Sequence, residues 1–379
     1  MPAGGAGATA TGAGVTLAHD YLLVMRGAER TFAAIADMYP DAPIFALLYD
    51  EAGTRGRFAG RSVSSSPLQR LGVGQSNFRR LMPLYPWAVA RLKLPPSQLV
   101  LSSSSAFAHG VRVPAGAVHI CYCHAPFRYV WYEEERALAE APAFLRTPVR
   151  WQLARMRRWD VRASARVTSY IANSQLTRER IKSCYGRDAP IIHPPVETQR
   201  FRPGKRGDAL LVVSELVRHK RLRTALEAAR RAGTPIRVVG SGPDHAALAQ
   251  AYPEAEFLGR ADDAMLAELY ASARALVMPS REEFGITSVE AQASGTPVIA
   301  AAAGGALETV LDGVTGRLVA LDDIDGFVAA IEGIDGMALD PARAVENAER
   351  FSVAAFQRNL AAEVQRVLRD AERAQSSSS

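Results

Sequence analysis

The sequence predicts an α/β protein with two doubly wound, Rossmann-like domains that face a central cleft. Its 379 residues exceed one ordinary domain and suit two domains of roughly 150 to 200 residues each. Short apolar runs alternate with longer amphipathic stretches in two successive series, a rhythm typical of βαβ units and parallel sheets. Hydrophobic residues make up 48% of the chain and charged residues 22%, enough apolar material for two cores.

The first series of predicted elements runs to about residue 192. A turn at Arg26 and Gly27 precedes an expected helix over residues 28–38. Ile191 and Ile192 close the series, because the prolines that follow stop regular structure. The expected strands are residues 15–18, 43–48, 99–102, 119–123 and 169–172.

The second series follows the turn at residues 201–204 and contains two expected helices, over residues 220–232 and 287–294. Its expected strands are residues 209–213, 236–239, 275–278 and 298–300. The predicted organisation is a flexible leader (1–14), an N-terminal domain (15–200), a C-terminal domain (201–352), a C-terminal crossover helix that packs back on the first domain (353–375) and a disordered tail (376–379).

Charge and cysteine content narrow the classes of function. The formal net charge of +6 suits an anionic ligand or a membrane surface. No nucleic-acid recognition motif accompanies the basic residues, so a nucleic-acid partner is not expected. Cys121, Cys123 and Cys184 cannot form a disulfide framework and fit a reducing cytosol. Cys121 and Cys123 are expected to be structural, and neither a metal site nor a signal peptide nor a membrane span is predicted.

The segment Pro279 to Glu290 (PSREEFGITSVE) carries the sharpest chemical signal. A strand is expected to end near Met278, and a helix to begin near Thr287 after a loop with Glu282 and Gly285. Backbone N–H groups at a helix start, approached closely through a glycine, form a natural site for a diphosphate. Two carboxylates beside it would accept hydrogen bonds from vicinal hydroxyls, as a nucleotide sugar offers them. The alternative is an ordinary helix start with first-turn acids.

This segment resembles the E-x7-E motif of the retaining family 4 glycosyltransferases, which have the GT-B fold. Further segments, in the family's order between residue 15 and about residue 352, resemble other motifs of that family. The closest subgroup contains mannosyltransferases of O-antigen and surface-polysaccharide assembly, most of which use GDP-mannose. The matching segments are 122–131 (YCHAPFRYVW), 171–174 (IANS) with 192–196 (IHPPV), 213–221 (VSELVRHKR), and 304–310 (GGALETV) with 313–316 (GVTG).

The resemblance implies roles for individual residues. Glu282 matches the glutamate that binds donor-sugar hydroxyls, and Glu290 the glutamate that binds the ribose diol. Lys220 matches a lysine that contacts the diphosphate and stabilises the leaving group. His124 matches a histidine near the reacting sugar. His124, Lys220 and Glu282 are therefore the expected catalytic residues.

Other matched positions bind the donor through the backbone or by charge. Phe284, Gly285 and Ile286 match backbone positions that face the sugar and diphosphate, and Arg218 is a further donor-binding candidate. The implied mechanism is front-face displacement, in which the acceptor hydroxyl attacks on the side from which the diphosphate leaves. No cofactor is expected. Arg128 is an acceptor-side candidate.

Two positions depart from the family pattern. The usual Gly-Gly-Ala-Glu turn reads Arg26-Gly27-Ala28-Glu29 here, so Gly27 keeps its donor-binding role while Arg26 crowds the site or adds a charge on the acceptor side. Glu215 stands where many members have a phosphate-binding arginine, and Arg218 or Arg221 would pair with it or replace the missing charge. These departures suggest an alternative, a sugar-nucleotide-binding protein with little turnover.

The acceptor side is less specific. Residues 78–95 and residues 150–166 mix arginines with tryptophans, leucines and methionines. Cationic aromatic faces of this kind suit shallow contact with anionic lipid. The alternative is a solvated helix face whose apolar residues pack inward while the arginines reach solvent.

Together these features predict a retaining hexosyltransferase that moves mannose from GDP-mannose to a hydroxyl of a glycan or polyprenyl-linked acceptor. It would act in the cytoplasm, at the inner face of the plasma membrane, in polysaccharide or glycolipid synthesis. A UDP-sugar with a small-molecule acceptor is the alternative within the same chemistry.

Overall fold

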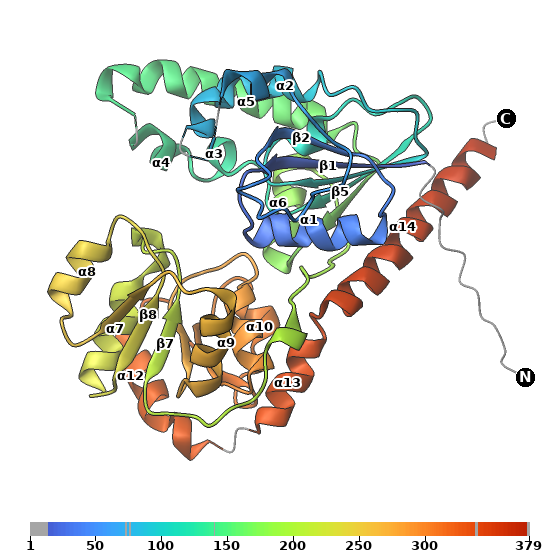
Figure 1. Cartoon of the computed structure of the whole chain (residues 1–379). Coiled ribbons are helices and arrows are strands. Elements are labelled where there is room, and N and C mark those ends of the chain that lie inside the picture. The colour runs from blue at the N-terminus through green and yellow to red at the C-terminus, as the bar shows by residue number, and fades with distance from the viewer. Residues whose placement is uncertain (1–13, 73, 76, 140, 338–339, 377–379) are drawn as a thin grey trace, which may run out of the picture. The chain divides into compact units, whose positions relative to one another are not determined.

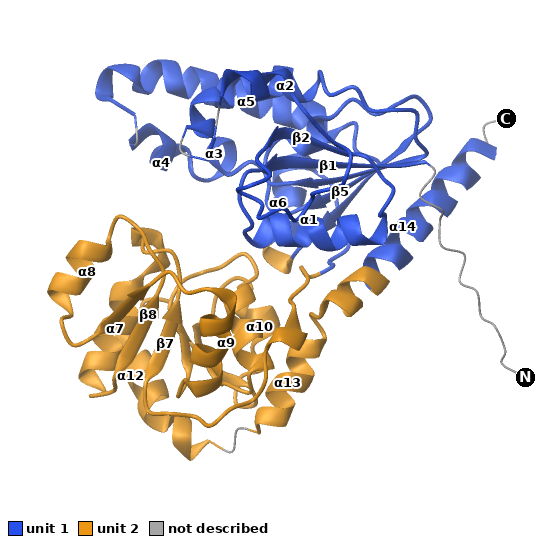
Figure 2. Cartoon of the chain, in the orientation of Figure 1, with its two compact units in different colours: residues 1–173, 177–192, 359–379 blue, residues 174–176, 193–358 orange. Residues whose placement is uncertain are grey.

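The computed structural model describes residues 14–72, 74–75, 77–139, 141–337 and 340–376 (Figure 1). The predicted leader, apart from Gly14, and residues 377–379 of the predicted tail lie outside these residues. The chain forms two compact units, coloured separately in Figure 2. Unit 1 contains the residues up to Asn173, Thr177–Ile192 and the segment from Asn359, and unit 2 contains Ser174–Leu176 and His193–Arg358. The chain thus passes into unit 2 at His193, just before the boundary predicted at residue 200.

Unit 1 is built on a six-stranded, wholly parallel sheet. Its strand order is β3-β2-β1-β4-β5-β6, the doubly wound order in which the topological switch point lies between β1 and β4. The strands are β1 (Val15–Leu22), β2 (Ile44–Tyr49), β3 (Val63–Ser65), β4 (Leu99–Ser104), β5 (Val118–Cys123) and β6 (Ser169–Ala172).

Helices cover both faces of this sheet. In Figure 1, α2 and α5 lie above the sheet of unit 1 and α1 lies below it. The α1 helix buries Phe32 and Ile35 as part of a six-residue buried stretch, which explains its amphipathic sequence. The helices are α1 (Gly27–Met38), α2 (Tyr85–Val89), α3 (Arg128–Trp131), α4 (Glu134–Ala139), α5 (Arg146–Ser164) and α6 (Gln175–Tyr185).

Unit 2 repeats the same topology with a second parallel sheet. Its order, β12-β11-β10-β7-β8-β9, places the switch point between β7 and β10. The strands are β7 (Leu210–Val213), β8 (Ile236–Val239), β9 (Glu256–Gly259), β10 (Leu276–Met278), β11 (Val298–Ala301) and β12 (Gly316–Val319).

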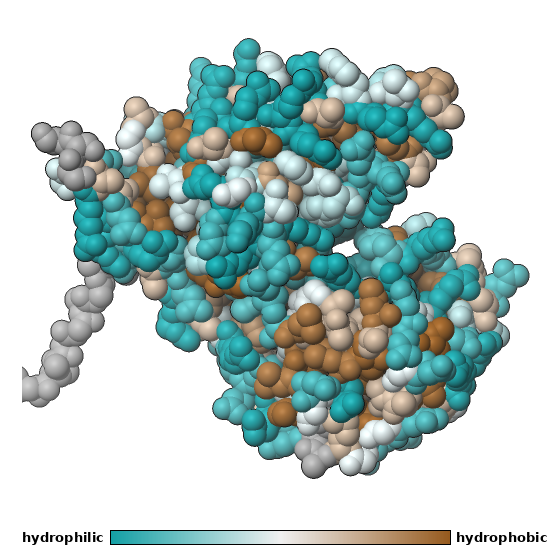
Figure 3. Space-filling view, turned by 180° about the vertical axis from the view of Figure 1, so that it is seen from behind, coloured by the Kyte–Doolittle hydropathy of each residue, from teal (hydrophilic) through white to brown (hydrophobic). Residues whose placement is uncertain are grey.

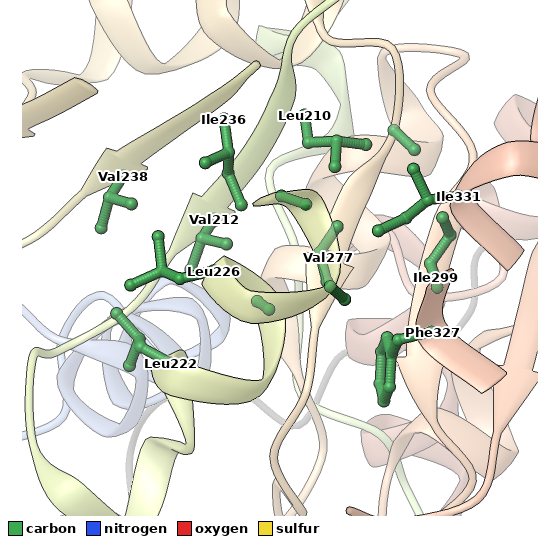
Figure 4. Close-up of a cluster of buried hydrophobic side chains, with 14 of the residues drawn as sticks. Leu210, Val212, Leu222, Leu226, Ile236, Val238, Val277, Ile299, Phe327 and Ile331 are labelled. Atoms are coloured by element: carbon green, nitrogen blue, oxygen red, sulfur yellow. The ribbon is translucent and has the colours of Figure 1, made fainter. Parts of the chain in front are cut away.

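The core of unit 2 lies between this sheet and its helices. Figure 4 shows Leu222 and Leu226 from one helix and Phe327 and Ile331 from another packed against strand residues such as Val277. Burial of this apolar surface is what holds the helices to the sheet. The helices are α7 (Leu222–Arg231), α8 (His245–Ala251), α9 (Asp263–Ser272), α10 (Ile286–Ala293), α11 (Ala306–Thr309), α12 (Ile324–Gly333), α13 (Pro341–Glu349) and α14 (Val353–Ser376).

The last helix, α14, connects the two units. Its residues up to Arg358 belong to unit 2 and those from Asn359 to unit 1, as Figure 2 shows. This agrees with the predicted C-terminal helix that returns to the first domain. Leu360, Val364 and Val367 are buried along the part that belongs to unit 1. Ser376, predicted to begin the tail, is the last residue of the helix.

The three strands that the sequence did not indicate, β3, β9 and β12, are all edge strands. Each mixes apolar with polar or exposed residues, as in the sequence VSS of β3, so none forms an apolar run. Several element boundaries also differ from the predictions by a few residues. The first strand continues to Leu22, and Lys220 lies in a 3-10 turn (Arg218–Lys220) before α7 and not inside the α-helix.

The surfaces of the two units differ in character. Figure 3, which shows the molecule from behind, has a continuous hydrophobic area on unit 2, whereas hydrophilic residues dominate the same face of unit 1. No helix among the described residues combines the length and the apolar composition that crossing a membrane requires.

Candidate functional site

The switch point of unit 2 brings together two residues that are far apart in the sequence. After β7 the chain reaches the 3-10 turn that ends at Lys220, and after its neighbour β10 it forms the loop with Glu282. The Lys220 ammonium donates to Oε2 of Glu282 over 2.5 Å. The carboxyl ends of neighbouring parallel strands therefore place two of the predicted catalytic side chains in direct contact.

The Glu282 carboxylate is held at both oxygens. Ser280, which is buried, donates its hydroxyl to Oε1 over 2.6 Å, and Lys220 occupies Oε2. The side chains of Lys220 and Glu282 keep 22% and 18% of their exposure, so both can still be reached from solvent. Ser280 gave no signal in the sequence.

The start of α10 has the backbone expected of a phosphate-binding turn. Gly285 precedes the helix with a φ of 85°, in the left-handed region, and a Cβ there would lie 3.2 Å from Cε of Met278. Ile286 is the first helical residue, so its N–H group and that of Thr287 point out of the helix start, whereas the Ser288 N–H donates to Gly285 O. Phe284 is buried against His193 and Phe351, so its side chain anchors the loop.

Glu290 lies one turn inside α10 and has a fixed partner. The hydroxyl of Tyr270, a fully buried residue of α9, donates to Oε2 of Glu290 over 2.9 Å. Burial, together with the nearby Glu290 carboxylate, raises the pKa of Tyr270 well above its usual range, so the phenol stays protonated as a donor. Tyr270 is a positioning residue that the sequence did not reveal, because it lies 20 residues away in another helix.

Arg218 and Arg221, on either side of Lys220, differ in conformation and in ion pairing. Arg218 is exposed in the same 3-10 turn as Lys220. Arg221 adopts a left-handed conformation and forms an ion pair with Asp322. Arg221 is therefore engaged elsewhere, and of the two arginines that the sequence offered as partners for the exposed Glu215, only Arg218 is not already paired among the described residues.

In unit 1 the polar residues gather at the carboxyl ends of β1, β4 and β5. Nε2 of His124, directly after β5, lies 2.8 Å from Oγ of Ser103, and the His124 backbone N–H donates to Ser104 O. The ring of His19, on β1, lies 6.4 Å from that of His124. Burial lowers the pKa of each histidine to about 3, and the neighbouring His19 ring lowers the pKa of His124 further. Both imidazoles are therefore neutral near pH 7.

Asp20 fixes the loop that follows β4. This buried carboxylate accepts N–H groups from four successive residues, among them Ala106 at 3.0 Å and Phe107 at 2.9 Å. Such a set of donors holds a carboxylate and its loop rigidly in place. His19 and Asp20 were not predicted as site residues, although two polar residues within a buried strand are a signal that the sequence contains.

The predicted turn before α1 lies beyond the end of β1. Gly27 is the first residue of α1, and the exposed Arg26 caps it through its backbone N–H, which donates to Oε2 of Glu29 over 3.0 Å. Burial raises the pKa of Glu29 to about 7. Arg128, the remaining acceptor-side candidate, is the exposed first residue of α3.

The cysteines and carboxylates do not form a metal site within the described part of the chain. No group of three or more His, Cys, Asp or Glu residues there is arranged to hold a metal ion. Cys121 and Cys123 are buried in β5, and burial raises the pKa of both thiols. Both cysteines pack in the hydrophobic cluster around Tyr170, which is a structural role.

One comparison with known proteins matches a defined part of unit 2. Residues 207–334 match the family model of glycosyl transferases group 1. A D-inositol 3-phosphate glycosyltransferase of Actinosynnema mirum is 36% identical over 186 residues, covering 40% of this chain and 45% of that protein. One from Frankia alni is 34% identical over 192 residues, covering 40% and 46%. The chain thus spans less than half the length of these curated relatives.

Solved structures match over nearly the whole chain. Anabaena HepE in complex with UDP superposes with a TM-score of 0.68 at 18% identity, covering 92% of this chain and 99% of that one. Sucrose-phosphate synthase of Thermosynechococcus elongatus gives 0.69 at 18% identity, covering 94% and 100%. At this identity the likeness concerns the fold. The chain therefore has the two-domain α/β fold of GT-B glycosyltransferases, and its residues 207–334 match the family model of glycosyl transferases group 1.

Proposed function

We propose that this protein transfers a hexose from a nucleoside diphosphate sugar to a hydroxyl group, with retention of the anomeric configuration. The observation that carries the proposal is the contact between Lys220 and Glu282 at the switch point of unit 2, beside the glycine-led start of α10. A cation for the leaving diphosphate and a carboxylate for sugar hydroxyls lie side by side there, as such a donor requires.

The chemistry proposed for this site rests on positioning and on charge. Lys220 would neutralise charge that develops on the departing diphosphate, a form of electrostatic stabilisation worth roughly 3 kcal/mol for one such group. Glu282 would orient the hexose through its hydroxyls, and Glu290, held by Tyr270, would bind the ribose diol. A neutral His124 fixed by Ser103 would donate or accept a hydrogen bond at the reacting sugar without adding charge.

For the donor and acceptor, the motif resemblance between residue 15 and about residue 352 supports mannose from GDP-mannose and a glycan or polyprenyl-linked acceptor. Transfer would then take place in the cytoplasm, at the inner face of the plasma membrane. The free cysteines are compatible with a reducing compartment, since two of the three are buried as thiols in β5.

A second candidate keeps the reaction but changes both substrates. The curated relatives are named for D-inositol 3-phosphate, a small phosphorylated polyol, and HepE is described in complex with UDP-glucose. These names support a UDP-sugar donor and a small hydroxylated acceptor. Arg26 and Glu215 depart from the family pattern, and these departures support a third candidate, a sugar-nucleotide-binding protein with little turnover.

Thermal stabilisation by nucleotides tests the donor class first. GDP, UDP, ADP and dTDP and their hexose conjugates would each be added at about 100 times Kd, where binding stabilises the native state by about 2.7 kcal/mol. We expect one base to stand out and Glu290→Ala to abolish the shift. Glu346→Ala is the matched control, because it removes an equal charge from a side chain that is 79% exposed in the same unit. A shift that survives Glu290→Ala would contradict the assigned site.

Turnover of the selected donor separates the remaining possibilities. We expect Lys220→Ala to lower kcat by about 10²- to 10³-fold, and the anomeric configuration of the product to match that of the donor by NMR. Nucleotide binding without transfer to any acceptor and without donor hydrolysis would support the binding-protein alternative. An inverted product would exclude the retaining mechanism.

A further inference from the structure

The hydroxyl of Ser103 and the imidazole of His124 share one hydrogen bond inside unit 1. Ser103 belongs to the central strand β4 and has no exposed surface. Its Oγ lies 2.8 Å from Nε2 of His124. A hydroxyl and a neutral imidazole can each donate or accept, so the direction of this bond decides which nitrogen of His124 carries the proton.

The His124 ring has a fixed place beside this serine. The His124 backbone N–H donates to Ser104 O over 2.9 Å, and its carbonyl accepts from the Thr177 hydroxyl over 3.1 Å. The ring of Tyr122 lies against it in an edge arrangement, with the ring centres 5.2 Å apart. The backbone is therefore held on both sides of the residue, and Nε2 is the nitrogen that faces the serine.

One direction of the bond satisfies the serine and the other does not. If Ser103 donates to Nε2, its hydroxyl hydrogen is used. If Nε2–H donates instead, that hydrogen needs a second acceptor, and among the described residues His124 is the partner that the Ser103 side chain has. A buried hydroxyl hydrogen without an acceptor is unfavourable, so Ser103 donates and the proton of the neutral ring lies on Nδ1.

The proton is thus on the nitrogen that a substrate can reach. Nδ1 of His19 and Nδ1 of His119 are buried without a partner, whereas Nδ1 of His124 is not closed off in this way. His124 is half-buried and directly follows the carboxyl end of β5, where ligands bind in doubly wound sheets. Its Nδ1–H group can therefore donate a hydrogen bond to an oxygen atom of a ligand.

We propose that Ser103 is a positioning residue that fixes His124 as the Nδ1–H tautomer, so that His124 donates a hydrogen bond to a substrate oxygen and does not act as a base. The role rests on the transfer reaction proposed above. With Nδ1 protonated and Nε2 occupied by Ser103, the ring has no free lone pair for the proton of the acceptor hydroxyl. That proton leaves on the diphosphate oxygen, while the bond from the sugar carbon to this oxygen breaks and the bond to the acceptor oxygen forms.

Nuclear magnetic resonance of the full chain with ¹⁵N-labelled histidine reads the tautomer directly. Long-range ¹H–¹⁵N spectra near neutral pH distinguish a protonated from an unprotonated ring nitrogen, and the signals of His124 are those that vanish in His124→Gln. We expect Nδ1 protonated and Nε2 unprotonated, without any substrate. In Ser103→Ala the Nε2–H tautomer, which free histidine prefers in water, should appear beside it. Ser103→Thr keeps a hydroxyl and should restore the original spectrum.

Kinetics of the same variants connect the tautomer to transfer. Ser103→Ala should lower kcat by about 10- to 100-fold and change the KM of the donor by less than about threefold, and Ser103→Thr should recover most of kcat. Ser102→Ala is the matched control, because Ser102 is equally buried in β4 and makes the same 2.8 Å contact with Nε2 of His119, whose Nδ1 is closed off. It should leave kcat within about twofold of the unmodified protein.

Several results would overturn the proposal. They are an unprotonated Nδ1 or two protonated nitrogens in His124 of the unmodified protein, a Ser103→Ala variant that changes tautomer but keeps its kcat, and an equal loss of kcat in Ser102→Ala. The last result would show that the serines act only through the stability of β4. If no donor is turned over at all, the transfer reaction itself is contradicted, and the spectrum of the unmodified protein still decides the tautomer.

Discussion

Unit 1 and unit 2 share one strand order but bury different kinds of polar groups. Unit 1 buries ionisable residues, among them His19 and His119 at 3% and 0% exposure, and Asp20 and Asp160 at 3% and 0%. Unit 2 buries hydroxyl and amide side chains to a similar extent, among them Ser288, Gln292 and Asn347. The same backbone topology therefore supports two interiors that respond differently to pH.

Two buried histidines of unit 1 each have a ring nitrogen without a hydrogen-bond partner among the described residues. These nitrogens are Nδ1 of His19 and Nδ1 of His119. Burial is the main reason that the pKa values of His19, His119 and His124 fall to about 3. A proton on any of these rings would place an uncompensated charge in the interior.

The corresponding polar groups of unit 2 satisfy one another. The Asn347 amide donates to Gln292 Oε1 at 2.7 Å and to Thr309 O at 2.9 Å, while Gln292 donates to Thr309 O at 2.8 Å. Ser288 completes the set by donating to the Thr309 hydroxyl. This neutral network joins α10, the helix with the candidate donor site, to α11 and α13. Comparison of the units teaches that α10 is joined to α11 and α13 by groups that do not titrate, whereas the His124 side contains buried groups that do.

Lowering the pH should therefore produce the largest difference in stability between unit 1 and unit 2. A histidine whose folded pKa lies below its ordinary value of 6.5 stabilises the fold fully above that value, and this stability is lost as pH falls from 6.5 towards 3. With three such residues, unit 1 should lose roughly 4 kcal/mol of stability per pH unit in that window. All four tryptophans, at positions 87, 131, 151 and 159, lie in unit 1, so an acid titration of tryptophan emission measures this loss.

Hydrogen exchange of unit 2 in the same titration provides the contrast. Its amides in α10 and β10 should stay protected at a pH at which unit 1 has begun to open. Simultaneous loss of protection in both units above pH 5 would show that the histidines do not decide acid stability. Emission that stays unchanged down to pH 3.5 would contradict the assignment directly.

The next largest loss of stability should come from disrupting the neutral hydrogen-bond network around Asn347 in unit 2. Asn347→Ala removes the donor of Gln292 Oε1 and one of the two donors of Thr309 O, and one buried unsatisfied acceptor of this kind destabilises by about 1 to 3 kcal/mol. Urea unfolding followed by circular dichroism should show the loss, with the tryptophan transition of unit 1 less affected. Exposed Glu346→Ala on the same helix is the control and should change stability by no more than about 0.5 kcal/mol. Equal shifts in both signals would show that the units unfold as one.

The smallest effect is expected from a change within the candidate donor site of unit 2. Tyr270→Phe removes only the hydroxyl that donates to Glu290, and one such hydrogen bond to a charged acceptor is worth about 1.5 kcal/mol. Affinity for the preferred nucleotide should fall about tenfold, with little change in the pKa-dependent stability of unit 1. Isothermal titration calorimetry measures this change. Unchanged affinity would mean that Glu290 does not bind the ribose or that it keeps its orientation without Tyr270.

Central and edge strands show how far the sequence could predict the fold. Every central strand was indicated by an apolar run, because a parallel strand covered on both faces must be hydrophobic. The edge strands β3, β9 and β12 were not, because one side of each faces solvent or a turn and tolerates polar residues. The start of α7 was misplaced because Arg221 adopts a left-handed conformation between the 3-10 turn and the helix, which no residue preference predicts.

The sequence by itself determined which segments form buried strands and that these strands make two doubly wound sheets, and it indicated the loop with Glu282 and the start of α10 as the candidate donor site. These features depend on local composition and on motif spacing, which a sequence contains explicitly. Only the tertiary structure decided the partners: Lys220 meets Glu282 across 62 residues and Tyr270 meets Glu290 from another helix. Such pairs depend on strand order and on the packing of one helix against another, and neither is encoded within a local stretch of chain.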